Sequence, residues 1–322
     1  MRVLSLFCGC GGMDLGFERA GHKVIWSNDN YKWACETYSK NFSIEPVRED
    51  IRKVEHFPDS DIVIGGYPCQ GFSLAGNRNV FDKRNYLYLE FARVLEAVQP
   101  RFFVAENVKG VGTPFKSAPR ALDIMERRFR SCGYRVVSEL LNAKDYGVPQ
   151  DRERVFIVGV REDLHKEYAF PKRSHGRRPL KPQVTLRQAI GDLPPPEDGE
   201  YYDHTGFSSR YMSRNRIRGW DEVSFTIQAN GRHVPLHPSC PLMKRMEQDK
   251  WEFTADIGKY RRLSVRECAR IQSFPDEFQF EGPLNSKYRQ IGNAVPPLLA
   301  QAIASELKAL VKTPELIEWI SN

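Results

Sequence analysis

No stretch of this 322-residue chain holds the roughly 18 consecutive apolar residues that a membrane-spanning helix needs. Glycines follow the apolar start, residues 1–7, too soon for the core of a signal peptide. We therefore expect no membrane span and a cytoplasmic protein. Hydrophobic residues still make up 41% of the chain, which is enough for a substantial core and argues against wholesale disorder.

The chain also lacks the cysteine spacing of a metal site. None of its seven cysteines forms a C-x-x-C pair, and Cys8 and Cys10 are too close in sequence for a zinc-binding pair. We therefore expect reduced thiols and no metal. Acidic residues are outnumbered, and the net charge of +7 permits an anionic partner without proving one.

The most informative stretch is GGYPCQGFS, residues 65–73, which follows the apolar run 61–64. The apolar run predicts a buried strand, the glycines end it in a sharp turn, and Pro68 fixes the backbone before Cys69. Cys69 would then lie at the carboxyl end of a parallel strand, where open α/β sheets bind ligands. A thiol held there is a candidate nucleophile, although a lone cysteine is more often buried and inert.

The N-terminal region has the pattern of a nucleotide-binding fold. Residues 2–7 predict a strand, the glycine-rich residues 8–12 a turn, and residues 13–20 a helix. Asp29 follows a second strand and lies 20 residues after Gly9, a distance that suits a carboxylate binding ribose hydroxyls. A third short strand around Val47 would end at Asp50. Helix capping or turn formation is the alternative role of both aspartates.

Alternating strands and helices continue to about residue 160. Strands are expected at 101–105, 134–141 and 155–160, and helices at 86–98 and 121–132. The first of these strands would end at residues 106–108, which places Glu106 at a strand end as a second chemical group. The alternative is a surface carboxylate after the strand. Gln150, Arg152 and Arg154 alternate, so they would share one face of an extended segment, the alternative being a solvated strand with salt bridges.

The composition changes after about residue 171. Five basic residues occur without an acidic one, namely Lys172, Arg173, Arg177, Arg178 and Lys181. The prolines at 194–196 and loop-like sequence follow, which indicates a domain boundary and a less regular second domain. A periodic apolar pattern over 298–310 predicts a final helix.

Six motifs in order make the chain resemble the cytosine-5 DNA methyltransferases. They are Phe7-x-Gly9-x-Gly11-Gly12, residues 65–73, residues 106–108, Gln150-x-Arg152-x-Arg154, residues 262–270 and residues 292–296. The resemblance implies an α/β, doubly wound, Rossmann-like methyltransferase domain that binds S-adenosyl-L-methionine, formed by residues 1–172 and 285–322. It also implies a smaller, irregular target-recognition domain, residues 173–284, with double-stranded DNA between the two.

The same resemblance assigns the site residues. The catalytic residues would be Cys69, Glu106, Arg152 and Arg154. The cofactor would contact Phe7, Gly9, Gly11, Gly12, Asp29, Asp50, Ile51, Pro68, Leu87, Asn293, Ala294 and Val295. DNA would contact Gln70, Ser73, Arg214, Arg216, Thr226 and Arg232, and the loop 71–85 would close over a flipped base. Asp29 stands where glutamate is commoner in the family.

These residue types suit the chemistry. A thiolate that adds to cytosine C6 makes C5 nucleophilic toward a methyl group, and positive charge on Arg152 and Arg154 would favour the thiolate. Glu106 would stabilise the charge that develops at N3. The base that removes the C5 proton is not identified. Because the cytosine is unreachable inside a duplex, it must be flipped out.

Residues 211–218 and 225–232 resemble the recognition region of the HaeIII-type methyltransferases, which modify GGCC and related sites. Arg214, Arg216 and Arg232 would read guanines, because an arginine fork fits guanine O6 and N7. Alternation would point Arg214 and Arg216 into one groove together. Alternatively, these arginines bind only phosphates. We expect a monomeric bacterial modification enzyme, associated with the nucleoid and linked functionally to a restriction endonuclease.

Three other functions remain open from the sequence. An RNA-directed member of the family, which methylates tRNA, would share the motifs, but the long variable region at 173–258 favours DNA. A nicotinamide-dependent oxidoreductase would explain only the glycine turn and Asp29. A DNA-binding protein that has lost catalysis would leave Cys69 and Glu106 without a role.

Overall fold

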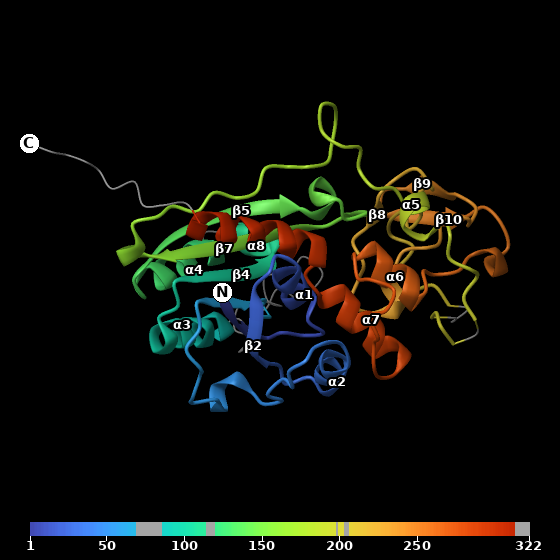
Figure 1. Ribbon diagram of the computed structural model, residues 1–322. Coiled ribbons are helices and arrows are strands. Elements are labelled where there is room, and N and C mark those ends of the chain that lie inside the picture. Colours follow the sequence, from blue (N-terminus) through green and yellow to red (C-terminus); the bar gives the residue numbers. More distant parts are fainter. Residues whose placement is uncertain (69–85, 114–119, 198, 203–205, 313–322) are drawn as a thin grey trace, which may run out of the picture.

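The computed structural model describes residues 1–68, 86–113, 120–197, 199–202 and 206–312 (Figure 1). Within these ranges the strands are β1 (Arg2–Leu6), β2 (Lys23–Asn28), β3 (Ile62–Gly65), β4 (Phe102–Val108), β5 (Tyr134–Asn142), β6 (Gln150–Asp151), β7 (Glu153–Arg161), β8 (Ser224–Phe225), β9 (Met243–Glu247) and β10 (Lys250–Phe253). The α-helices are α1 (Gly12–Arg19), α2 (Lys32–Asn41), α3 (Leu87–Val98), α4 (Ala121–Arg130), α5 (Leu186–Ile190), α6 (Val265–Ile271), α7 (Leu284–Asn293) and α8 (Pro297–Lys312).

Six strands form the central sheet, in the order β2-β1-β3-β4-β7-β5. The first four are parallel, whereas β7 runs antiparallel to both β4 and β5. The predicted α/β doubly wound fold is confirmed, with one reversed strand that the sequence did not reveal. The reversal has a simple cause, because a parallel neighbour to β5 would need a long crossover, whereas the segment between β5 and β7 is short.

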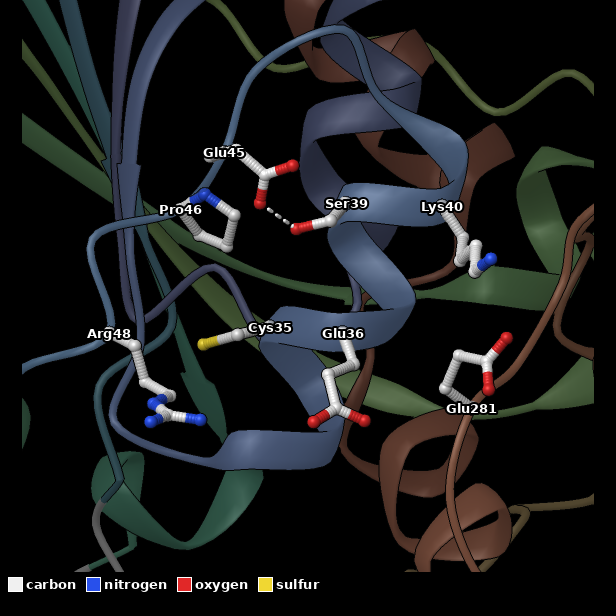
Figure 2. Close-up of a pocket in the computed structure, with 8 residues that line it drawn as sticks. All are labelled: Cys35, Glu36, Ser39, Lys40, Glu45, Pro46, Arg48 and Glu281. Carbon is white, nitrogen blue, oxygen red and sulfur yellow. Dashed lines mark hydrogen bonds between the residues drawn. The ribbon is translucent and has the colours of Figure 1, made fainter.

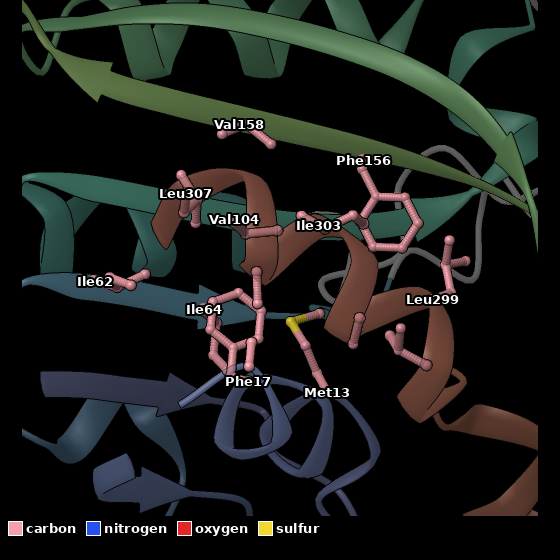
Figure 3. Packing of buried hydrophobic residues seen from close by; sticks show 14 of the residues in the cluster. Met13, Phe17, Ile62, Ile64, Val104, Phe156, Val158, Leu299, Ile303 and Leu307 are labelled. Atoms are coloured by element: carbon pink, nitrogen blue, oxygen red, sulfur yellow. The ribbon is translucent and has the colours of Figure 1, made fainter. Parts of the chain in front are cut away.

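Helices cover both faces of the sheet, which is why the central strand β3 is buried along its whole length, whereas the edge strand β5 alternates buried and exposed residues. On one face, α1 and α8 pack on side chains such as Ile62, Ile64 and Val104 (Figure 3). On the other face, α3 and α4 pack on neighbours such as Val63 and Phe103. Successive residues of one strand therefore enter different cores.

Helix α8, near the end of the chain, packs against α1, near its start. A Cβ built on Gly16 of α1 would lie 2.5 Å from the Cβ of Ala300, so only glycine permits this approach. By length and hydropathy the helical stretch Leu284–Val311 could cross a bilayer, but half of its most apolar window is buried inside the protein. Core packing against α1 and the sheet accounts for that composition.

A less regular part contains α5, α6 and strands β8 to β10, and Figure 1 shows it at the right of the sheet. A small apolar cluster holds it together, and the β9–β10 hairpin packs on that cluster through Met243, Trp251 and Phe253. Its link to the sheet is a two-stranded parallel pair, in which Gln150 and Asp151 of β6 face Ser224 and Phe225 of β8.

Two local predictions are wrong. Val47 forms only an isolated bridge with Asn28, and no strand surrounds it. Asp50 therefore does not end a strand; its side chain accepts the Arg52 N–H and begins the 3-10 turn Ile51–Lys53. Glu106 lies near the end of its strand, as predicted, because pairing of β4 with β7 continues to Val108. The alternative of a surface carboxylate is wrong, since Glu106 is buried.

Candidate active site

The predicted catalytic and cofactor residues gather at one edge of the sheet. Phe7 follows β1, Asp29 follows β2 and Pro68 follows β3, while Glu106 lies two residues from the end of β4. Carboxyl ends of adjacent parallel strands meet at a common edge, so the topology alone brings these segments together.

Glu106 and Arg154 form a buried ion pair at this edge. They lie diagonally across the β4–β7 pair, since Arg154 is opposite Val108, and Arg154 Nε is 3.0 Å from Glu106 Oε1, with the Arg154 and Glu106 side chains 16% and 10% exposed. Burial raises the pKa of the Glu106 carboxyl, although Arg154 and Arg152 act in the opposite direction. The shared face predicted for Gln150, Arg152 and Arg154 is thus turned inward, and the alternative of a solvated strand is wrong.

The segment that leads to the predicted nucleophile, Cys69, is held beside this pair. Asn107 Nδ2 donates to the Tyr67 carbonyl at 3.2 Å, and a Cβ on Gly66 would lie 3.1 Å from Glu106 Oε2. The chain enters Pro68 next to the Glu106 carboxylate. Cys69, Gln70 and Ser73, and the loop predicted to close over the base, lie outside the described residues.

The glycine turn after β1 has a left-handed backbone and is open at Gly9. Gly9 and Gly11 have φ values of +54° and +87°, and a Cβ on Gly9 would meet nothing within 4 Å. Asp29 supports this turn: its Oδ2 accepts the Gly9 N–H at 3.0 Å and its Oδ1 the Tyr31 N–H at 2.8 Å. Burial raises the pKa of Asp29. Each carboxylate oxygen keeps a second lone pair, so Asp29 can still accept two hydroxyls.

Residues far apart in the sequence complete this pocket. A Cβ on Gly12 would lie 2.4 Å from the Val295 carbonyl oxygen and 3.0 Å from the Ala294 Cβ, so the turn lies directly against the 293–295 segment. Arg152 fixes that segment, since its NH2 donates to the carbonyls of Gly292 and Ala294 at 2.9 and 3.0 Å. Arg152, which lies between β6 and β7, therefore connects these strands to the predicted cofactor segment.

The other predicted cofactor residues flank the same edge. Ile51 is buried, Leu87 begins α3 and is half-buried, and Asn293 is exposed. Arg52 forms an ion pair with Asp50, and its hydrogen bonds lower the pKa of that carboxyl to about 2. An open turn, an acidic acceptor and a close backbone approach fit a nucleoside-containing cofactor.

The pocket in Figure 2 lies beside this site. It has a volume of about 640 Å³ and is lined by Cys35, Glu36, Ser39, Lys40, Glu45, Pro46, Arg48 and Glu281. None of these residues belongs to the predicted cofactor set. Cys35 Sγ donates to the Asp29 carbonyl at 3.3 Å, so the pocket contacts the site through the Asp29 backbone.

The arginines predicted to read bases differ in exposure. Arg214 and Arg232 are exposed, but Arg216 is 8% exposed, and its guanidinium donates to the carbonyls of Tyr211 and Arg210. Arg214 and Arg216 therefore do not lie together on one exposed face, and this part of the prediction is wrong. The cause is local, because Arg216 also stacks over the Tyr211 ring at 4.4 Å.

Thr226 and Arg232 are both fixed by neighbours. Thr226 Oγ1 donates to the Asp151 carbonyl at 2.6 Å and so secures the segment after β8 to β6. Arg232 Nε donates to Tyr202 Oη at 2.6 Å, which directs its guanidinium along the Tyr202 ring.

The sequence analysis missed a buried amide pair. Gln150 Oε1 accepts the Ile227 N–H at 2.9 Å, and its Nε2 donates to Gln272 Oε1. Gln272 Nε2 donates in turn to the carbonyls of Ile291 and Ala294. The chain of bonds connects the recognition segment, the β6 segment and the cofactor segment. Both glutamines are wholly buried, and buried amides need hydrogen-bond partners. The sequence contained no signal for this pair, because the burial of Gln272 cannot be read from its neighbours.

Comparison with known proteins agrees with this geometry. The family model for C-5 cytosine-specific DNA methylases matches residues 1–309. The chain belongs to this family. The methylase is thus a DNA (cytosine-5)-methyltransferase, as its motifs predicted, and its substrate is DNA.

Two relatives indicate the type of enzyme. The methylase is 47% identical to Type II methyltransferase M.BsuRI of Bacillus subtilis, over 95% of this chain and 79% of that protein. It is 46% identical to M.MthTI of Methanothermobacter thermautotrophicus, over 96% of this chain and 97% of that protein. It is accordingly a methyltransferase of the restriction–modification type.

Solved structures share the fold. A crystal structure described as a prophage-encoded DNA modification methyltransferase (E. coli) superposes with a TM-score of 0.73 and 26% identity, covering 97% of this chain and all of that chain. DNMT2 of Spodoptera frugiperda superposes with a TM-score of 0.69 and 18% identity, covering 97% of this chain and 99% of that one. The second likeness supports the fold alone.

Proposed function

We propose that the methylase methylates C5 of a cytosine flipped out of duplex DNA, in a GGCC-type site, through a covalent bond between Cys69 Sγ and C6. The observation that carries this proposal is the buried Glu106–Arg154 pair. It places a carboxyl of raised pKa directly against the segment that leads to Cys69.

The residues would divide the chemistry as follows. Cys69 adds to C6, and the electrons of the C5–C6 double bond become available at C5. Glu106 donates a proton or a strong hydrogen bond at N3, where the added electron density accumulates. C5 would then form its new bond to the methyl group that the cofactor supplies. Loss of the C5 proton to a base, departure of the Cys69 thiolate from C6 and return of the N3 proton to Glu106 restore the ring. Arg154 keeps the Glu106 carboxyl in place throughout.

We infer that S-adenosyl-L-methionine is the cofactor. Phe7, the 9–12 turn and Asp29 would hold it together with Asp50, Ile51, Leu87 and the 293–295 segment. When bound, it supplies an electrophilic methyl group and leaves as S-adenosyl-L-homocysteine. Asp29 would accept the ribose hydroxyls with the lone pairs that its two backbone bonds leave free.

Sequence recognition would fall first to Arg214 and Arg232, because both are exposed. Arg216 would have to exchange its bonds to two carbonyls for a base, so its contribution depends on movement of its loop on DNA. We also propose the division into residues 1–172 with 285–322 and residues 173–284. Packing of α8 on α1 supports the discontinuous larger domain.

We propose in addition that the enzyme acts as a monomer in the bacterial cytoplasm and protects DNA from a cognate endonuclease that it does not bind. The link to an endonuclease is supported by the relatives' names, which describe them as Type II methyltransferases.

One experiment tests the whole proposal. Plasmid DNA from cells that express the methylase is sequenced for 5-methylcytosine, with Cys69→Ala as the inactive control. We expect modification of one cytosine in GGCC-type sites for the wild type alone. Modification elsewhere would refute only the specificity, whereas equal modification by Cys69→Ala would refute the covalent mechanism.

A further inference from the structure

Residues 172–181 form an exposed basic loop, which leads from the end of the sheet toward the recognition part. Lys172, Arg173, Arg177, Arg178 and Lys181 are all exposed, and the loop contains no acidic residue. None of these five cations belongs to the candidate active site described above.

The basic loop has a defined conformation. The N–H groups of Ser174 and His175 both donate to the Asp145 carbonyl at 3.0 Å. Across the loop, Gly176 N–H donates to the Lys181 carbonyl at 2.8 Å, and Lys181 N–H donates to the Ser174 carbonyl at 3.2 Å. The backbone is therefore pinned at its base and closed on itself, so its cations are presented together.

Most of this positive charge is unneutralised. Arg173 Nε lies 3.4 Å from Asp145 Oδ2. Within the described part of the chain, Lys172, Arg177, Arg178 and Lys181 have neither an ion pair nor a side-chain hydrogen bond. A loop that served the fold alone would gain from nearby acids, whereas exposed cations without counter-charges attract a polyanion.

The loop lies at the functional edge of the sheet. Because β5 and β4 are both antiparallel to β7, β5 is parallel to β4 and ends at the same edge as the active-site strands. Asp145, which pins the loop, lies in the 3-10 turn Ala143–Tyr146 directly after β5. Figure 1 shows the yellow-green loop standing out at the top, between the end of β5 and α5.

We propose that the basic loop binds backbone phosphates of duplex DNA that flanks the target site. The edge that holds Glu106 must face DNA, and duplex DNA carries one charge per roughly 1.7 Å of its axis. A loop beside that edge meets DNA outside the few base pairs that the enzyme reads. The contact is to phosphate, so it is independent of the base sequence and of the GGCC assignment.

The test compares two triple variants of the whole chain. The first is Lys172→Gln, Arg177→Gln and Arg178→Gln, which leaves the paired Arg173 in place. The matched control is Arg2→Gln, Arg19→Gln and Lys23→Gln, three exposed cations at the opposite edge of the sheet. Dissociation constants are measured between 50 and 200 mM salt, on a site-only duplex and on one extended by about one helical turn, roughly ten base pairs, on each side.

For the wild type and the control, we expect tighter binding to the extended duplex. The loop variant should lose that advantage. Between 50 and 200 mM salt its loss of affinity should be about tenfold smaller than the loss for the wild type, which is the effect of two missing phosphate contacts. Equal affinity and salt slope in the two triple variants would overturn the proposal. An equal loss on both duplexes would also overturn it, because the contact would then not be to the flanks. If only the GGCC preference were absent, the specificity proposal would fail and the loop result would stand.

Discussion

Replacing Glu106 by glutamine should separate stability from catalysis. Glutamine keeps the shape of the side chain and can still accept a hydrogen bond from Arg154 Nε, but it has no proton to give to N3. General acid–base groups contribute roughly 10²–10⁴ in rate. We therefore expect methyl transfer to slow by about that factor, with a smaller change in cofactor affinity.

The effect on stability follows from the sign of the pKa shift. Two effects on the free energy of unfolding oppose each other. Loss of the carboxylate leaves the Arg154 charge without a buried counter-charge, which by itself would cost about 3–5 kcal/mol. However, burial raises the pKa of Glu106 although both arginines favour its charged form, so the desolvation of the carboxylate outweighs the ion pair. Each unit of such a shift corresponds to about 1.4 kcal/mol.

The pH dependence of stability shows which protein, wild type or Glu106→Gln, is favoured. A carboxyl with a raised folded pKa contributes stability that is present below its unfolded pKa, about 4.3, and is lost as pH rises through the folded value. Glutamine has no such loss. The variant should therefore be at least as stable as the wild type at pH 8, and the difference between them should shift in its favour from pH 5 to pH 8.

The assays are single-turnover methyl transfer to duplex DNA and chemical unfolding at both pH values. Glu153→Gln is the matched control, since Glu153 adjoins Arg154 on β7 but pairs with the exposed Lys109 at 2.8 Å. Exposed pairs contribute about 0–1 kcal/mol, so this control should change little. A Glu106→Gln protein that unfolds several kcal/mol more easily at pH 8 would refute the argument from burial, and a normal transfer rate would refute the catalytic role.

Four further variants test other parts of the site. Cys69→Ala should abolish methyl transfer and leave duplex binding intact, because phosphate contacts supply most of the affinity; turnover and gel-shift measurements decide. Asp29→Ala should weaken cofactor binding in calorimetry by roughly ten- to a hundredfold, since hydrogen bonds to a charged group contribute about 1.5–3 kcal/mol, and unchanged affinity would make Asp29 only a turn residue. Arg232→Ala should cost about 1–3 kcal/mol of discrimination at one base pair, whereas a uniform loss on all duplexes would show a phosphate contact. Gln272→Met should reduce the free energy of unfolding by about 1–3 kcal/mol for each polar group left unpaired, and denaturant titration measures it.

The segments that the sequence assigned to the candidate active site lie together in the structure, but the sequence misjudged local backbone and burial. Strands β1 and β3 were predictable because each is an apolar run that glycines follow. The orientation of β7 was not, because strand direction is set by tertiary pairing rather than by local pattern. The strand end at Glu106 was predictable, but its burial was not, because a carboxylate is costly to bury without a partner, and that partner, Arg154, lies on the reversed neighbouring strand.

The recognition arginines show the limit of periodicity. Alternation correctly separates neighbours in an extended segment, but it assumes a regular strand. Within the described residues, 214–218 belong to no strand, and Tyr211 lies where its ring and carbonyl can bind Arg216. The exposure of such a loop depends on packing that no local pattern contains.

The β6–β8 pair restricts how new specificities could be engineered. A chimeric enzyme can be made by exchanging the recognition part for that of another methylase. It must keep the backbone N–H at position 227 that donates to Gln150 Oε1, and the Thr226 hydroxyl that donates to the Asp151 carbonyl. A graft that begins after residue 227 would leave this junction intact. One that replaces residues 224–227 would have to rebuild the junction, so the portable module is smaller than the domain that carries it.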